Sequence, residues 1–271
     1  MKNFLVPIDF SDTSINAAKY AIGLTKDVPE AHITLYHVYS KISFATLSSK
    51  EEGSRQKVSE EALQEVVTKI NGGNSESISI VAEEGSFLES IKDYVMGHYT
   101  DMVIMGITGS SRITQVFMGT NTLNVIRHIS CPVMIIPAEA HFTGFKHGVF
   151  ISDFKDVART TPFAALQNIL DTFKPELDIL NVDSEHFVEL TEEFKLERSA
   201  MEDKLGKYDP NFSFLRAYDV LDGINSYVET KEIDVIISVP RKHSFLSQLF
   251  KTSHTKKLAY HSTVPILAIP G

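Results

Sequence analysis

The chain has 271 residues, of which 43% are hydrophobic, 14 are Gly and 10 are Pro. This length and composition suit one large or two small globular domains and exclude a disordered or collagen-like chain. The formal charge of −9, from 26 Lys and Arg against 35 Asp and Glu, gives no overall support for binding nucleic acid or an anionic membrane.

Strands and helices are expected to alternate through the first half of the chain. The predicted order is strand 3–9, helix 13–26, strand 32–38, helix 51–70, strand 77–83, helix 87–98, strand 101–106, helix 119–129 and strand 132–136. The strands are short continuous apolar runs such as VMII, which are typical of strands buried on both faces of a parallel sheet. Ser11 or Asp12 is the expected cap of the first helix.

The second half repeats this order. The predicted elements are strand 147–152, helix 157–172, strand 177–182, helix 186–206, strand 212–217, helix 219–231, strand 234–239, helix 253–261 and strand 264–269. The segment 101–137 aligns without a gap with 234–270 at an offset of 133 residues, pairing Gln115 with Gln248 and His128 with His261. We therefore expect two domains, 1–140 and 146–271, with the boundary inside 138–146.

Ligands of open parallel sheets bind beyond the carboxyl ends of the strands. The first strand ends at Pro7-Ile8-Asp9 and the second at His37-Val38. The fourth runs into a loop with Gly106 and Gly109, after which Gly119, Thr120 and Asn121 open a helix. Glycines allow close backbone approach, and a helix N-terminus favours an anion, so this edge predicts a phosphate site.

The spacing Gly-x2-Gly-x9-Gly-Thr, the opening Asp-Phe-Ser-Asp-x-Ser at 9–14 and the ending Cys-Pro-Val-Met-Ile-Ile-Pro at 131–137 resemble the universal stress protein family. The resemblance covers the whole chain as two tandem family domains. It implies the α/β class, with two tandem Rossmann-like domains, each an open five-stranded parallel sheet in the order 3-2-1-4-5 flanked by helices. It also implies that the first domain binds ATP, as in the ATP-binding branch of the family.

By this resemblance, the adenosine end of ATP would meet Asp9 and the backbone of Val38, with Pro7 and Ile8 in the same site. The phosphates would be held by the loop of Gly106, Gly109 and Gly119 together with Thr120 and Asn121. Any Mg²⁺ would be held chiefly by phosphate oxygens and water, and no protein-only metal site is expected.

The second half departs from the pattern at every glycine. At the offset of 133, Val239, Lys242 and Thr252 stand in place of the three glycines, so we expect no ATP bound there in the same manner. The loop instead carries basic residues, which either capture an anion or form an ordinary solvated surface: Arg241, Lys242, His243, Lys251, His254, Lys256 and Lys257.

No catalytic residue is predicted. The sequence has no nucleophile elbow, no metal-ligand spacing and no Lys beside Thr120, and its single Cys131 excludes an internal disulfide. The leading hypothesis is a cytoplasmic stress-response protein that binds ATP as a regulatory or signalling ligand. The alternatives are a slow ATPase or other nucleotide-converting enzyme, in which Arg112, Thr114 and Ser110 or Ser111 would orient water, and a scaffold that binds no nucleotide.

The absence of a secretory or membrane-spanning segment favours the cytoplasm. The apolar strands 132–136 and 264–269 are expected at sheet edges, which proteins usually cover. We therefore expect them to pair within one chain as a pseudo-dimer, with further dimerisation through another surface, such as helix 186–206, left open. A protein partner is also left open, whereas nucleic acid and membrane partners are not expected.

Overall fold

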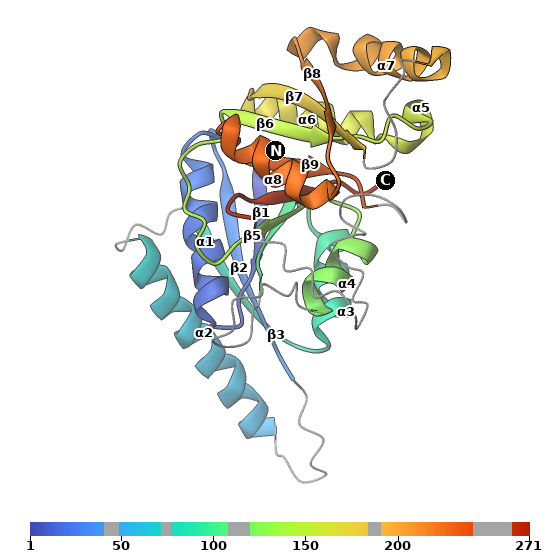
Figure 1. Cartoon of the computed structure of the whole chain (residues 1–271). Helices are drawn as coiled ribbons and strands as arrows, with labels where there is room; N and C mark the ends of the chain where they lie inside the picture. The colour runs from blue at the N-terminus through green and yellow to red at the C-terminus, as the bar shows by residue number, and fades with distance from the viewer. Residues whose placement is uncertain (41–48, 72–76, 108–119, 184–190, 241–261) are drawn as a thin grey trace. The chain divides into compact units, whose positions relative to one another are not determined.

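The computed structural model describes residues 1–40, 49–71, 77–107, 120–183, 191–240 and 262–271. These residues form two compact units, one ending at Phe142 and the other beginning at Thr143. Each unit is a parallel sheet with helices on both faces (Figure 1), and each sheet has five strands in the order 3-2-1-4-5 within its unit. The predicted fold class is therefore confirmed.

The first unit contains nine elements among its described residues. They are β1 (Asn3–Pro7), α1 (Asp12–Thr25), β2 (His32–Tyr39), α2 (Ser49–Asn71), β3 (Ile78–Glu84), α3 (Phe87–Gly97), β4 (Met102–Gly106), α4 (Thr120–His128) and β5 (Val133–Ile136). The strand order is β3-β2-β1-β4-β5, with parallel pairing throughout. Helices α1 and α2 pack together on one face of the sheet, and α3 and α4 on the other (Figure 1).

The central strand β1 is buried on both sides, since Phe4, Leu5 and Val6 are at most 1% exposed. Continuous apolar character is what this position requires, because helices cover both faces of the sheet. Helix α1, which follows β1, packs closely against the sheet through small side chains. Among them, Ala17 and Ala18 are fully buried. The first unit thus places the end of β1 between helices that leave the sheet on opposite faces.

The second unit repeats this architecture. Its elements are β6 (His147–Ile151), α5 (Val157–Thr160), α6 (Phe163–Phe173), β7 (Glu176–Asp183), α7 (Glu192–Leu205), the short 3-10 helix Gly206–Tyr208, β8 (Asn211–Arg216), α8 (Val220–Thr230), β9 (Val235–Ser238) and β10 (Ile266–Ala268). The strand order is β8-β7-β6-β9-β10, again with parallel pairing.

The two units share a hydrogen-bonding device at the amino ends of their sheets. Oδ2 of Asp101 accepts from the backbone N–H groups of Lys2 and Asn3, at 2.7 and 2.9 Å. Oδ2 of Asp234 accepts from those of Lys146 and His147, both at 2.9 Å. In each unit, an aspartate just before the fourth strand thus gives a hydrogen-bond partner to the backbone N–H groups at the start of the first strand.

The prediction of one continuous helix after the first strand of the second unit is wrong. The helix expected over 157–172 is two helices, α5 and α6, separated at Thr161 and Pro162. Proline has no N–H to donate and disfavours helical backbone at the residue before it, so the chain breaks there and restarts at Phe163. The equivalent helix of the first unit has no proline and runs unbroken from Asp12 to Thr25.

Other boundaries differ by a few residues. The strand predicted over 3–9 ends at Pro7, because Phe10 turns the chain with a φ of 62°. Of the helix predicted over 186–206, the described part begins at Glu192, where the Thr191 hydroxyl accepts from Phe194 N at 3.2 Å. Residues 184–190 and the whole predicted helix 253–261 lie outside the described residues.

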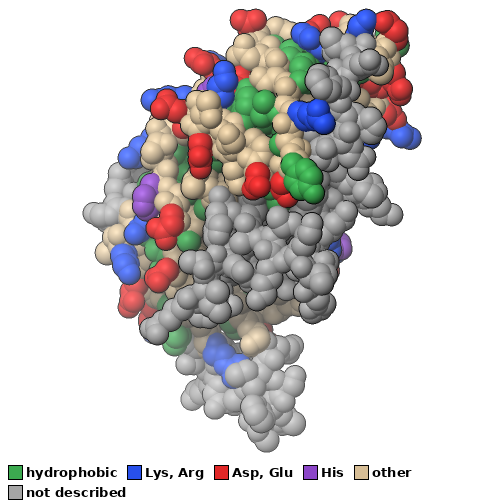
Figure 2. Space-filling model, in the orientation of Figure 1, with side chains coloured by type: hydrophobic (Ala, Val, Ile, Leu, Met, Phe, Trp, Pro, Cys, Tyr) green, Lys and Arg blue, Asp and Glu red, His purple; other side chains and the backbone are tan. Residues whose placement is uncertain are grey.

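Charged side chains of both signs are interspersed over the described residues on the face seen in Figure 2. This pattern is typical of an ordinary solvated surface. In the part of the chain that the structure describes, no helix is long and apolar enough to cross a membrane.

Candidate functional site

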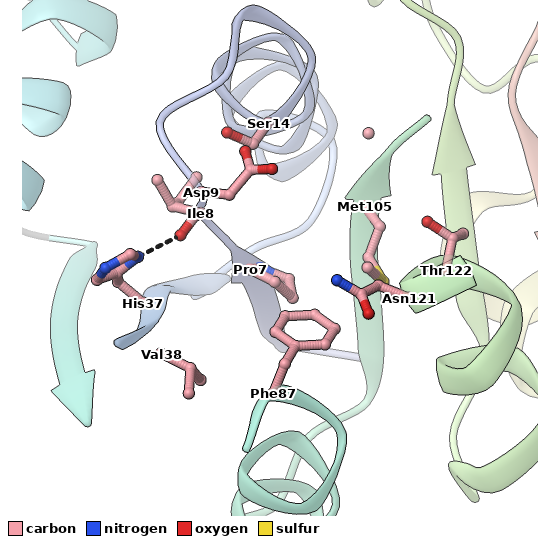
Figure 3. A pocket seen from close by; sticks show the side chains of 11 residues that line it. Pro7, Ile8, Asp9, Ser14, His37, Val38, Phe87, Met105, Asn121 and Thr122 are labelled. Atoms are coloured by element: carbon pink, nitrogen blue, oxygen red, sulfur yellow. Dashed lines mark hydrogen bonds between the residues drawn. The ribbon is translucent and has the colours of Figure 1, made fainter. Parts of the chain in front are cut away.

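A pocket of about 200 Å³ opens at the carboxyl ends of β1, β2 and β4 in the first unit (Figure 3). Because α1 and α4, the helices that follow the neighbouring strands β1 and β4, lie on opposite faces of the sheet, the space beyond these two strands is left uncovered. The lining residues come from three strand ends and from the starts of α1, α3 and α4. They are Pro7, Ile8, Asp9, Ser14, His37, Val38, Phe87, Met105, Gly106, Asn121 and Thr122.

Asp9 is fixed by the turn that follows β1. Its Oδ1 accepts from Ser11 N at 3.0 Å and from Ser11 Oγ at 2.5 Å. Burial acts to raise the pKa of Asp9, but these hydrogen bonds outweigh it and hold the net pKa below the usual value. The Asp9 side chain is therefore a carboxylate at neutral pH.

Ser11 links this carboxylate to the start of α1. Its Oγ is the helix N-cap and accepts from Ser14 N at 3.2 Å, while Ser14 Oγ donates to Ser11 O at 3.0 Å. The sequence predicted Ser11 or Asp12 as the cap, and the structure selects Ser11. A short hydrogen-bonded chain thus holds Asp9 in position beside the pocket.

His37 lies where β1 and β2 part. Its Nδ1 is 2.7 Å from the carbonyl oxygen of Ile8 (Figure 3), and its ring packs against that of Phe10 with centroids 4.6 Å apart. A carbonyl oxygen only accepts, so Nδ1 carries the proton and donates. The His37 side chain therefore donates to the Ile8 carbonyl just beyond the last paired residues of β1 and β2.

Gly106 ends β4 and lines the pocket, but it also has a packing reason to be glycine. A Cβ at this position would lie 2.3 Å from the carbonyl oxygen of Thr13 in α1. The sequence explained this glycine by ligand approach, and the close contact with α1 is a second requirement that the spacing did not reveal.

The predicted site residues fall into two groups. Six of them line the pocket: Pro7, Ile8, Asp9, Val38, Gly106 and Asn121. Thr120 is the first residue of α4, next to Asn121, whereas Gly109 and Gly119 lie outside the described residues. The described part of the predicted site thus comes together at one edge of one sheet.

Five lining residues were not among the predicted site residues: Ser14, His37, Phe87, Met105 and Thr122. His37 and Met105 are the next-to-last residues of the predicted strands 32–38 and 101–106, so their positions alone could have suggested them. Ser14, Phe87 and Thr122 lie in the first turns of helices, and only the arrangement of those helices around β1 brings them to the pocket.

The equivalent edge of the second unit keeps some of these features and loses others. Asp153 Oδ1 accepts from Lys155 N at 3.3 Å, as Asp9 does from Ser11, and Asn181 Nδ2 donates to Ser152 O at 2.9 Å, as His37 does to Ile8. Val239, which is 2% exposed, fills the position of Gly106. The basic residues predicted at 241–257 lie outside the described residues.

The described part of the chain offers no side-chain cluster for a metal ion. No group of three or more His, Cys, Asp or Glu side chains that could hold an ion occurs there. Cys131 is buried, and burial raises the pKa of its thiol to about 12. This cysteine fits a place in the core.

Comparison with known proteins gives the family. The model of the universal stress protein family matches residues 1–137. A universal stress protein of Methanocaldococcus jannaschii is 30% identical over 141 residues, which are 50% of this chain and 81% of the relative.

Two solved structures share the fold over nearly the whole chain. A universal stress protein from Archaeoglobus fulgidus has a TM-score of 0.70 at 18% identity and covers 99% of this chain and 98% of its own. A protein of unknown function from Pseudomonas aeruginosa has a TM-score of 0.59 at 12% identity and covers 100% and 92%. From the family match and the archaeal relative, this chain belongs to the universal stress protein family.

Proposed function

We propose that the first unit binds ATP in the pocket at the end of β1, and that the nucleotide acts as a regulatory or signalling ligand. The observation that carries the proposal is the convergence of an apolar slot, an ionised carboxylate and a helix start at one strand edge. Each of these three features suits a different part of a nucleotide.

The base would lie in the apolar part of the pocket. Ile8, Val38, Phe87 and Met105 supply this lining, and flat aromatic ligands gain from burial against such side chains. The backbone of Val38 would provide the hydrogen bonds that orient the base, because β1 ends before it can pair with this residue.

The sugar would lie beside Asp9. A carboxylate that keeps its negative charge at neutral pH accepts hydrogen bonds from two adjacent hydroxyl groups, which ribose offers. Ser11 restricts the carboxylate in its position before any ligand arrives, so little side-chain entropy would be lost on binding.

The phosphates would lie toward the start of α4. The N–H groups of a first helical turn have no partners within the helix, and the helix dipole favours an anion there. Asn121 in this first turn lines the pocket. By the family resemblance, Gly106, Gly109 and Gly119 would allow the backbone to approach the phosphates closely. Mg²⁺ would be held by phosphate oxygens and water.

Isothermal titration of the full chain with Mg-ATP, ADP and AMP tests the proposal. Asp9→Asn should weaken ATP binding roughly tenfold to a hundredfold, since a hydrogen bond to a charged group is worth about 1.5–3 kcal/mol. The matched control is Asp153→Asn, which makes the same change at the equivalent place in the second unit and should leave the affinity unchanged.

Two results would contradict the proposal. One is a lack of binding by any of the three nucleotides at millimolar concentration, and the other is equal affinity in wild type and Asp9→Asn. A turnover assay over hours on the same variants separates a ligand from a substrate, because hydrolysis by this site must fall when Asp9 is changed.

A further inference from the structure

The hydrogen-bond ladder between β1 and β2 stops just before the pocket. Ile8 N donates to Tyr36 O at 2.8 Å, and in a parallel pair the next bond would run from Val38 N–H to Ile8 O. That acceptor is instead occupied by Nδ1 of His37, at 2.7 Å. Among the described residues, no backbone hydrogen bond joins the Val38 N–H to the β1 side.

The same device recurs in the second unit with a different side chain. Ser152 N donates to Leu180 O at 3.0 Å, and Asn181 Nδ2 then donates to Ser152 O at 2.9 Å. Val182 N–H is left in the same situation as Val38 N–H. Imidazole and carboxamide both carry an N–H donor, and in each unit this donor bonds the last carbonyl of the first strand.

This capture matters for ligand binding because Val38 lines the pocket. A backbone N–H and C=O on an unpaired strand edge offer a donor and an acceptor side by side, which is the complement of a heteroaromatic base edge. Ile8 O has a second lone pair, so the imidazole competes with the Val38 N–H for this oxygen rather than filling it. Without the imidazole, the Val38 N–H would pair with Ile8 O, and the donor would be lost to the ligand.

We propose that His37 is a positioning residue that holds the Ile8 carbonyl and thereby reserves the Val38 backbone for the base of the ligand. The identity of the ligand rests on the proposed function, whereas the competition for the Ile8 carbonyl does not. Phe10 supports the arrangement, because its ring packs against the imidazole and restricts its rotation.

Amide hydrogen exchange of the full chain without nucleotide tests the structural half of the inference. Val38 should exchange fast in the wild type, and His37→Leu should slow it about tenfold or more as its N–H closes onto Ile8 O. His37→Asn keeps a donor, as Asn181 does, and should leave Val38 fast. Asn181→Leu should slow Val182 in the second unit.

Titration of the same variants with ATP tests the binding half. His37→Leu should weaken binding roughly fivefold to tenfold, the equivalent of one net hydrogen bond, and His37→Asn should restore the affinity to within about twofold of wild type. A structural defect alone would not be corrected by asparagine, which lacks the imidazole ring that packs on Phe10.

The outcomes separate this inference from the proposed function. Slow exchange of Val38 already in the wild type, or no change in His37→Leu, would overturn the inference even if ATP binds. If His37→Leu slows Val38 while no nucleotide binds any variant, the capture stands and the assignment of ATP fails. Equal affinity in wild type and His37→Leu would overturn the positioning role.

Discussion

The two units share one architecture but differ at the edge where a ligand would bind. Both keep the aspartate after the first strand, the left-handed residue that follows it (Phe10 and Phe154) and the side-chain capture of the last carbonyl. The first unit has Gly106 against the start of an unbroken helix, whereas the second has buried Val239 and a broken one.

This difference shows that a repeat can retain a backbone frame while its loops and packing diverge. Gly106 permits Thr13 to lie against the end of β4, and a β-branched residue there is incompatible with such an approach. In the second unit, the helix start has a different course, with Asp156 in the left-handed region. Substitutions at particular positions of the two units test how far their structures are equivalent.

The largest effect is expected from Gly106→Ala. The new Cβ would lie 2.3 Å from Thr13 O, so backbone must shift, at an expected cost of about 3 kcal/mol in the free energy of unfolding. Urea denaturation of the full chain measures this cost. The matched control is Gly97→Ala, where a Cβ would meet nothing within 4 Å and stability should change little. Equal effects of the two replacements would refute the packing reason.

A buried polar cluster distinguishes the second unit. Asp178, 2% exposed, accepts from Tyr227 OH at 2.6 Å and from Asn211 Nδ2 at 3.1 Å, and its Oδ2 is 3.3 Å from His147 Nε2. At the equivalent place in the first unit, Tyr94 OH is 3.4 Å from the Thr34 hydroxyl.

Removing the two acceptors should therefore have unequal effects. Asp178→Ala should lower the free energy of unfolding by about 2–3 kcal/mol, because the buried Tyr227 hydroxyl and the Asn211 amide lose a charged acceptor at once. Thr34→Ala should cost less than about 1 kcal/mol, since its hydrogen bond is long. Urea denaturation measures both losses in the free energy of unfolding. A larger loss in Thr34→Ala than in Asp178→Ala would contradict this prediction.

The aspartates at the amino ends of the sheets are expected to behave alike. Asp101→Ala and Asp234→Ala each remove an acceptor of two backbone N–H groups, and each should cost about 1–2 kcal/mol. The double variant should show the sum, because the two sites share no partner. Unequal costs of the two single variants, or a cost of the double variant that differs from their sum, would contradict this prediction. The two aspartates would then not be equivalent, although they make the same hydrogen bonds.

The smallest effect concerns Cys131, whose counterpart at the offset of 133 is Val264. Burial raises the pKa of the Cys131 thiol from 9.0 to about 12, so the unfolded chain loses this proton at lower pH than the folded chain. The contribution of this thiol to the free energy of unfolding is therefore complete below pH 9 and is lost as the pH rises from 9 to 12. Wild type should thus lose roughly 1 kcal/mol more than Cys131→Val between pH 8 and pH 9.5.

The sequence by itself determined the class and the repeat. Buried parallel strands read as continuous apolar runs, and helices as periodic ones, so the alternation was visible without any contact being known. The strand ends carrying Asp9, Val38 and Gly106 were also visible, because ligand sites of such sheets lie at the carboxyl ends. The break at Pro162 was local as well, and the residue types there could have predicted it.

Only the tertiary structure decided which side chains converge and what each of them does. Ser14, Phe87 and Thr122 reach the pocket because three helices start around one strand, and no periodicity along the chain encodes that meeting. The contact of Gly106 with Thr13 and the capture of Ile8 O by His37 join residues 93 and 29 positions apart. Such distances between packed groups are set by the folded backbone, whereas the sequence specifies only the groups available to fill them.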